Sequence, residues 1–183
     1  KLHFTKRFSN FKSYVDCVKI CVLNFNKINW FYNWYFNNYS DKWYVSLFKS
    51  KKIQGEITPA YSILSIEEIK RNKWGALLVF ERENSLKNVV SDAVPMHASF
   101  SPELLVSIFN PSSPLHDGAV VIHNNLIEAA ACILPLTESK TLNPEMGTRH
   151  RAALGISEES DALAVVISEE SGKISVAENG YFI

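Results

Sequence analysis

The sequence predicts an α/β (α+β) domain with a mixed, largely antiparallel central β-sheet flanked by helices. Three observations lead there. Strand-like apolar runs outnumber helical segments, most of these runs are joined in pairs by short polar turns, and a clear helix-start signature lies between them. Short turns join antiparallel neighbours, and helices then cover the apolar faces of the sheet.

The first two elements follow residue 61. Residues 62–72 alternate apolar and charged side chains with helical spacing, and Ser65 is a possible N-cap. Residues 75–81 form a continuous apolar run after a glycine. We expect a short amphipathic helix followed by a buried strand.

A second helix is expected over residues 101–109. Ser101 can cap it, Pro102 suits its first position, and Glu103 lies in its first turn. The run Asn-Pro-Ser-Ser-Pro at residues 110–114 marks its end.

Two hairpins and one further helix complete the expected domain. Each hairpin is a pair of apolar runs around a polar turn: 118–123 and 126–134 around 124–125, then 162–168 and 173–177 around 169–172. Between the hairpins, residues 135–146 read as a polar loop and residues 148–156 as a helix entered through Gly147.

Composition divides the 183 residues in two. The apolar fraction of 46% indicates a globular chain, and the zero net charge provides no general attraction for nucleic acid or an anionic membrane. Residues 1–53 nevertheless carry a charge of +8, and residues 54–183 carry −8. We expect an N-terminal segment over 1–53 and a compact α/β domain over 54–183.

Residues 1–53 hold fifteen of the twenty-two aromatic residues and contain no Ala, Gly, Pro, Glu or Gln. Three interpretations stay open. The segment is an aromatic-rich helical packing, oligomerisation or regulatory appendage, a remnant of a membrane-adjacent anchor, or a stretch that does not represent the natural N-terminus.

Cysteine use and hydropathy predict a cytoplasmic protein. Cys17, Cys21 and Cys132 have no disulfide-framework or zinc-site spacing, which fits a reducing compartment, and Cys132 reads as a small core residue. No run of eighteen apolar residues is present, so no membrane span is expected in this chain.

Residues 147–153, Gly-Thr-Arg-His-Arg-Ala-Ala, concentrate phosphate-binding chemistry at an expected helix start. Free N–H groups and the helix dipole favour an anion there, and arginine forks match phosphate oxygens. The alternative is a solvated cationic helix face. Cations in a first turn oppose the dipole unless an anion or a carboxylate compensates them, which favours the anion site.

Residues 115–119, Leu-His-Asp-Gly-Ala, offer an imidazole and a carboxylate beside a glycine. Both groups are competent ligands for Mg²⁺-like or Mn²⁺-like ions. An ordinary Asp-Gly turn is the alternative.

Other polar residues receive no role from the residues alone. Glu169 and Glu170 are expected to face solvent in a hairpin loop, and His3, His97 and His123 have no obvious partners.

Together, the 115–119 and 147–153 segments resemble the Asp-Gly-Ala and Arg-His-Arg motifs of the bacterial diadenylate cyclase domain. Further stretches follow the same pattern over roughly residues 62–180: 75–82, 101–109, 130–136 and 168–172. Two motifs at the right separation are more specific than either alone. The short soluble members with a helical N-terminal segment are the most similar.

The resemblance implies an enzyme that condenses two ATP molecules into cyclic di-AMP and releases two pyrophosphates. One protomer binds one ATP, so two protomers face each other at least transiently, and a larger resting oligomer is compatible with this. A divalent metal, Mn²⁺ or Mg²⁺, is the implied cofactor. No nucleic acid partner is implied.

The resemblance also assigns roles to residues of the first motif and its strand. Asp117 becomes the metal ligand and hydroxyl-activating group, with His116 as a second ligand. Gly118 and Ala119 allow ribose and base to approach the backbone, and Leu134 contacts adenine through its main chain.

In the second motif, Thr148, Arg149 and Arg151 hold the phosphates, and His150 orients that turn. Arg149, His150 and Arg151 count with Asp117 as catalytic. Glu170 matches a family acid near the metal and phosphates. One departure concerns Ile133, where some members carry a tyrosine that stacks on adenine.

Two alternatives to catalysis follow from the same residues. The domain could hold ATP or cyclic di-AMP without turnover, or be autoinhibited, or it could be a structural domain whose two motifs are unrelated in space. Every functional reading requires Asp117 and the arginines of residues 148–151 to line one pocket.

Overall fold

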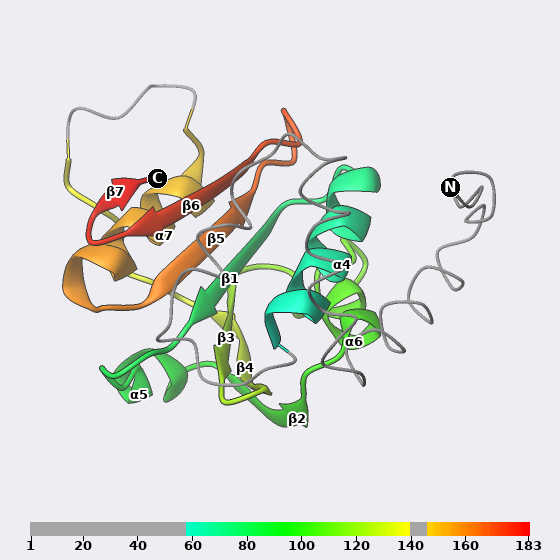
Figure 1. The fold of residues 1–183 in the computed structure, drawn as a ribbon, viewed down its shortest axis with the longest axis horizontal. Helices are drawn as coiled ribbons and strands as arrows, with labels where there is room; N and C mark the ends of the chain where they lie inside the picture. Colours follow the sequence, from blue (N-terminus) through cyan, green and yellow to red (C-terminus); the bar gives the residue numbers. More distant parts are fainter. Residues whose placement is uncertain (1–57, 140–145) are drawn as a thin grey trace, which may run out of the picture. The chain divides into compact units, whose positions relative to one another are not determined.

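A computed structural model describes residues 58–139 and 146–183 (Figure 1). The expected N-terminal appendage over residues 1–53 and His3, Cys17 and Cys21 lie outside the described residues. So do residues 140–145 of the expected polar loop.

Within the described residues, seven strands form one sheet in the order β2-β4-β3-β1-β5-β6-β7. Their bounds are β1 Ala76–Phe80, β2 Val94–Ser99, β3 Ala119–His123, β4 Leu126–Cys132, β5 Leu163–Ile167, β6 Ile174–Glu178 and β7 Tyr181–Phe182. β1 and β3 are parallel, with Leu78 opposite Val120, and the other pairs are antiparallel. The expected mixed, largely antiparallel sheet is confirmed.

Strand direction gives the sheet two chemically different edges. β1 and β3 begin at one edge, where β4 and β5 end, because Ala76 pairs with Ile167 and Ala119 with Cys132. We call this the N-edge, and the opposite edge, where β1 and β3 end, the C-edge. Segments distant in sequence therefore meet at each edge.

The helices are α4 Thr58–Arg71, α5 Lys87–Val90, α6 Pro102–Ile108 and α7 Thr148–Glu159. The predicted start of α6 is confirmed, since Ser101 Oγ accepts a hydrogen bond from Leu104 N at 3.1 Å and Pro102 follows the cap. Ser65 is not a cap. It is buried inside α4, which begins at Thr58, and Oγ donates to the Ser62 carbonyl.

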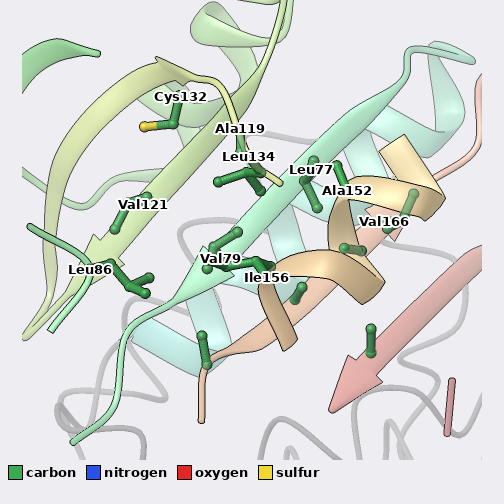
Figure 2. Close-up of a cluster of buried hydrophobic side chains, with 14 of the residues drawn as sticks. Leu77, Val79, Leu86, Ala119, Val121, Cys132, Leu134, Ala152, Ile156 and Val166 are labelled. Carbon is green, nitrogen blue, oxygen red and sulfur yellow. The ribbon is translucent and has the colours of Figure 1, made fainter. Parts of the chain in front are cut away.

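The core lies on both faces of the sheet. On one face, α7 packs over β5 and β6 and covers small and branched side chains, as Figure 2 shows with α7 in front of β1 and α4 behind it. Leu77, Val79, Ala119, Val121 and Val166 belong to this cluster. Their neighbours along the strands are equally buried on the opposite face, where α4 and α6 pack together.

The hairpin turns follow the predicted chemistry. Asn124 and Asn125 both adopt positive φ, 47° and 65°, which matches the twist of a two-residue β-turn.

Cys132 is 1% exposed in the core, and burial raises the pKa of its thiol to about 11 against the opposing hydrogen bond to the Val121 backbone. Its predicted role as a core residue is confirmed.

Three short elements, α5, β2 and β7, were not expected. β2 is an edge strand whose residues are exposed or half-buried, contains Pro95 and pairs with β4 through an irregular register. It therefore lacks the apolar alternation that identifies a strand. β7 has two residues, and α5 buries none of its side chains.

Polar pairs close the C-edge. Arg82 Nη1 donates to Glu178 Oε1 at 2.6 Å, and Asp161 accepts the N–H groups of Glu83 and Asn84 at 3.2 and 3.1 Å. His97 and His123, for which the sequence shows no obvious partners, lie beside carboxylates in the structure. His97 Nδ1 is 3.1 Å from Glu128 Oε2, and His123 Nδ1 is 3.3 Å from Glu81 Oε1 without a hydrogen bond among the described residues. Strand pairing produces both contacts between residues that are distant in sequence. The pairing of β1 with β3 brings Glu81 to His123, and the pairing of β2 with β4 brings His97 to Glu128.

In residues 58–139 and 146–183, the helices are all too short or too polar to serve as a membrane crossing.

Candidate functional site

The N-edge collects four segments that carry functional side chains. Asp117 and Gly118 precede β3, Ile133 and Leu134 follow β4, and Glu169 follows β5. α7 begins at Thr148, beside them, since Thr148 and Arg149 line cavities together with residues from these segments.

The larger cavity has a volume of about 420 Å³, within the range of about 300–1,000 Å³ usual for small-molecule sites. Asp117, Gly118 and Ala119 line it from the start of β3, and Thr148 and Arg149 from the start of α7. The two sequence motifs therefore share one cavity.

The rest of this cavity is apolar and comes mainly from the residues around the end of β4. Ile133 and Leu136 expose 86% and 44% of their surface, while Leu134 and Leu77 form its buried wall. Exposed aliphatic side chains beside a polar motif suit the faces of a flat heterocycle.

A second cavity of about 200 Å³ adjoins the first through Thr148 and Arg149, which line both. Its other walls include His150 from α7 and Ser168, Glu169 and Glu170 from the turn after β5. It is polar and open to solvent.

The start of α7 supplies positive potential to both cavities. Gly147 is the N-cap and brings no side-chain oxygen, and the first turn of the helix contains no acidic residue. Helical hydrogen bonds begin only with His150 and Arg151, whose N–H groups donate to the Gly147 carbonyl at 3.1 and 3.3 Å. The N–H groups of Thr148 and Arg149, which precede them, have no helical acceptor and suit an anion.

The Arg149 guanidinium forms an ion pair with Glu169, which also lines the second cavity. Its Nη1 donates to Glu169 Oε2 at 3.1 Å, and its Nε is buried without a hydrogen-bond partner among the described residues. Glu169, expected to face solvent without a role, thus supplies the carboxylate that a cation in a first turn requires. A guanidinium with spare donors at a cavity wall can donate hydrogen bonds to phosphate oxygens.

His150 lines the second cavity. Burial lowers its pKa below the usual value, and the nearby carboxylate of Glu170 opposes that shift. The ring packs edge-on against Phe182, with centroids 5.8 Å apart. This contact ties the first turn of α7 to the last strand.

Gly118 permits a close approach between β3 and β4. Its φ is +114°, and a Cβ there would lie 2.8 Å from the Ala131 carbonyl carbon and 2.9 Å from the Cys132 oxygen. At this point the register of β3 and β4 shifts, and Ala131 has a φ of 54°. The bulge and the glycine together shape the floor of the larger cavity.

The wall that contains Leu134 is fastened to α7. Thr137 N donates to the Arg151 carbonyl at 3.1 Å, and Thr137 Oγ1 donates to Glu158 Oε1 at 2.6 Å. These two hydrogen bonds fix the position of the segment after β4 relative to α7.

Two predicted site residues lie outside both cavities. Arg151 is exposed, and His116 is half-buried next to Asp117 with Nδ1 2.6 Å from the Ser113 carbonyl. Since that carbonyl can only accept, Nδ1 is the donor of this hydrogen bond.

A metal ion would find only part of its ligand set here. The described residues contain no group of three His, Cys, Asp or Glu side chains that could hold a metal ion. Asp117 offers a carboxylate at the cavity, and His116, the preceding residue outside the cavity, offers Nε2. Mg²⁺-type ions commonly combine one or two protein ligands with substrate phosphates and water, which fits this pair.

Comparison with known proteins identifies related domains. Residues 63–182 match the family described as DAC, DisA bacterial checkpoint controller nucleotide-binding. The resemblance inferred from the two motifs is confirmed by this match.

Curated relatives include the cyclic di-AMP synthase CdaA of Bacillus subtilis, 50% identical over 116 residues, which are 63% of this chain and 42% of the relative. The diadenylate cyclase CdaS of Bacillus thuringiensis is 47% identical over 133 residues, which are 70% of this chain and 66% of the relative. The chain thus matches less than half of the first relative and about two thirds of the second.

Solved structures agree on the fold. A double mutant of DacA from Staphylococcus aureus has a TM-score of 0.64 at 44% identity and covers 65% of this chain and 79% of its own. A protein from Bacillus cereus, described as a hypothetical membrane spanning protein, has a TM-score of 0.71 at 37% identity and covers 94% of this chain and 83% of its own.

Proposed function

The chain belongs to the DAC family of nucleotide-binding domains, and from this premise we propose that it condenses two ATP molecules into cyclic di-AMP. The observation that supports the proposal most strongly is the shared cavity of Asp117 and Arg149. The carboxylate comes from one motif and the guanidinium from the other, so together they can engage different parts of one nucleoside triphosphate.

We place adenine in the larger cavity and the phosphates at the start of α7. The aliphatic side chains of Ile133 and Leu136 pack on the base, and the main chain of Leu134 meets its polar edge. Gly118 and Ala119 leave room for ribose against the backbone.

The phosphates then lie where the two cavities adjoin. Thr148 and Arg149 line both cavities and donate to phosphate oxygens, and the free N–H groups of the first turn add to them. His150, as a neutral ring, orients this turn, while Glu170 lies across the second cavity. Arg151 is exposed just outside, where it can reach the phosphates of a nucleotide held by a second copy.

Asp117 and His116 would hold a divalent cation, Mn²⁺ or Mg²⁺, with phosphate oxygens completing its coordination. When bound, the cation neutralises phosphate charge and lowers the pKa of the attacking hydroxyl. Asp117 lies at the cavity to accept that proton.

The reaction requires two copies of the chain. In each half, the 3′-oxygen of one ATP forms a bond to the α-phosphorus of the other, the bond from that phosphorus to the bridging oxygen breaks, and pyrophosphate leaves. One cavity holding one ATP cannot close this ring, so two N-edges must face each other. The residues contribute mainly by positioning two polyanions and stabilising their charge.

The test incubates the full chain with ATP and MnCl₂ and separates the products by chromatography. We expect cyclic di-AMP and pyrophosphate in a ratio of one to two. Asp117→Asn should lower the rate by about 10²–10⁴-fold, the usual contribution of a proton acceptor, with an unchanged circular dichroism spectrum.

Asp92→Asn is the matched control, because Asp92 is exposed and lines neither cavity. A wild-type rate in Asp117→Asn would refute the role of Asp117. ATP binding without product would instead indicate a nucleotide-binding module.

A further inference from the structure

Gly75 lies at the N-edge immediately before β1 and is buried. A Cβ built on it would overlap Arg149 Nη1, and would lie 2.9 Å from Arg149 Cζ and 2.8 Å from Glu169 Oε2. The Arg149–Glu169 ion pair therefore occupies the space that any side chain at position 75 would need.

Three elements meet at this point. Gly75 precedes β1, Arg149 belongs to the first turn of α7, and Glu169 follows β5. Arg149 has a side chain only 25% exposed, whereas Glu169 is 60% exposed, so the guanidinium is the enclosed member of the pair. Packing against the backbone of Gly75 and the bond to Glu169 limit where the guanidinium can point.

We propose that Gly75 is a positioning residue. Because Gly75 has no side chain, the Arg149 guanidinium can occupy the space beside it and so lie in the wall shared by both cavities. This inference rests on the proposed function, in which Arg149 holds phosphate. Gly75 touches no substrate and acts only through Arg149.

The atoms that a methyl group would meet make the test selective. At Gly75 they are the far ends of two flexible side chains, and the φ of Gly75 is outside the left-handed region, so alanine suits the backbone. At Gly155 of α7 the same methyl would meet backbone, including the Pro135 carbonyl carbon at 2.7 Å. Gly75→Ala should therefore move the ion pair, whereas Gly155→Ala should strain the fold.

The experiment measures binding of 3′-deoxyadenosine triphosphate with MnCl₂ by calorimetry on the full chain, because this nucleotide lacks the attacking hydroxyl. We expect Gly75→Ala to bind about tenfold more weakly, the loss of one charged hydrogen bond, with a melting temperature within about 2 °C of wild type. In an Arg149→Ala background, Gly75→Ala should add less than about a twofold change, since the two residues act through one contact.

Wild-type affinity in Gly75→Ala overturns the inference, and so does an equal loss in the Arg149→Ala background. A melting temperature lowered as far as in Gly155→Ala also overturns it, because Gly75 would then support the fold. If wild type binds the nucleotide but forms no cyclic di-AMP, the proposed activity fails and the inference stands on the binding data.

A crystal structure of Gly75→Ala tests the geometry even if no nucleotide binds. A displaced guanidinium supports the inference, and an unmoved one overturns it.

Discussion

At the C-edge of the sheet, polar side chains meet partners within the protein: Arg82 pairs with Glu178, the His123 ring lies beside Glu81, and Asp161 accepts from two backbone N–H groups. At the N-edge, Asp117 and Glu170 line cavities and have no ion pair within the part of the chain that is described, and Arg149 has one partner with donors to spare. Both edges carry carboxylates, an arginine and a histidine, but the side chain of Arg82 is 4% exposed and that of Arg149 is 25% exposed.

The difference teaches that residue type alone does not separate structure from function here. Charges that neutralise one another hold strands and loops together, whereas charges left facing a cavity are available to a ligand. Substitutions at the two edges should accordingly separate stability from nucleotide binding.

The largest expected effect on stability is at the C-edge. Glu178→Ala leaves the guanidinium of Arg82, 4% exposed, without its partner, and Nε and Nη2 already have none among the described residues. We expect the free energy of unfolding to fall by about 3 kcal/mol in urea titrations, near the lower end for breaking a buried pair, with unchanged nucleotide affinity.

The double variant Arg82→Met with Glu178→Leu removes both charges and should recover most of that loss. A loss below about 0.5 kcal/mol in Glu178→Ala would mean that the C-edge pair is not structural.

Gly118→Ala tests whether the N-edge also carries structural strain. A methyl group would meet the Ala131 and Cys132 backbone at a φ of +114°, so we expect a loss of about 2 kcal/mol together with weaker nucleotide binding. Gly147→Ala is the comparison, since its methyl group meets nothing within 4 Å. When both variants are measured by thermal denaturation, Gly147→Ala should lower the stability less than Gly118→Ala. Equal losses would show that the close approach at Gly118 is unimportant.

Glu169→Gln should change little at the N-edge. Its ion pair with Arg149 is largely solvent-exposed on the carboxylate side and contributes about 0.5 kcal/mol, so nucleotide affinity should fall about twofold. Glu159→Gln, at the exposed end of α7, is the charge-matched control. Tighter binding in Glu169→Gln would show that Glu169 competes with phosphate instead of orienting the arginine.

The smallest effect concerns pH. Because the folded state lowers the pKa of His150, the unfolded state binds the proton more readily below about pH 6.5. This residue should therefore reduce stability as pH falls from 7.5 to 5.5 and have no effect above that range. His150→Gln should flatten the pH dependence of urea unfolding, and an unchanged slope would contradict the burial of a neutral ring.

Much of the fold could be predicted because the signals are local. Ser101 and Pro102 specify a helix start within four residues, and Asn124-Asn125 specifies a tight turn in two. β2 escaped prediction because an exposed edge strand carries no apolar alternation, and Ser65 was misassigned because helical residues preceding 62 extend α4 beyond its periodic part.

The partners of charged residues could not be predicted in the same way. Glu169 and Arg149 are twenty residues apart, and Glu81 and His123 meet only because β1 and β3 are parallel neighbours. Arg149 in a first turn did indicate that some anion must compensate it, but the identity of that group depended on where β5 ends.

By itself the sequence determined the kinds of element, the two motifs and the family they resemble, because each of these is written in neighbouring residues. Only the tertiary structure decided that both motifs line one cavity, that Gly75 faces Arg149, and that Arg151 and His116 lie outside the cavity walls. The physical reason is strand order: one parallel pair inside an antiparallel sheet brings the starts of β1 and β3 and the ends of β4 and β5 to the same edge.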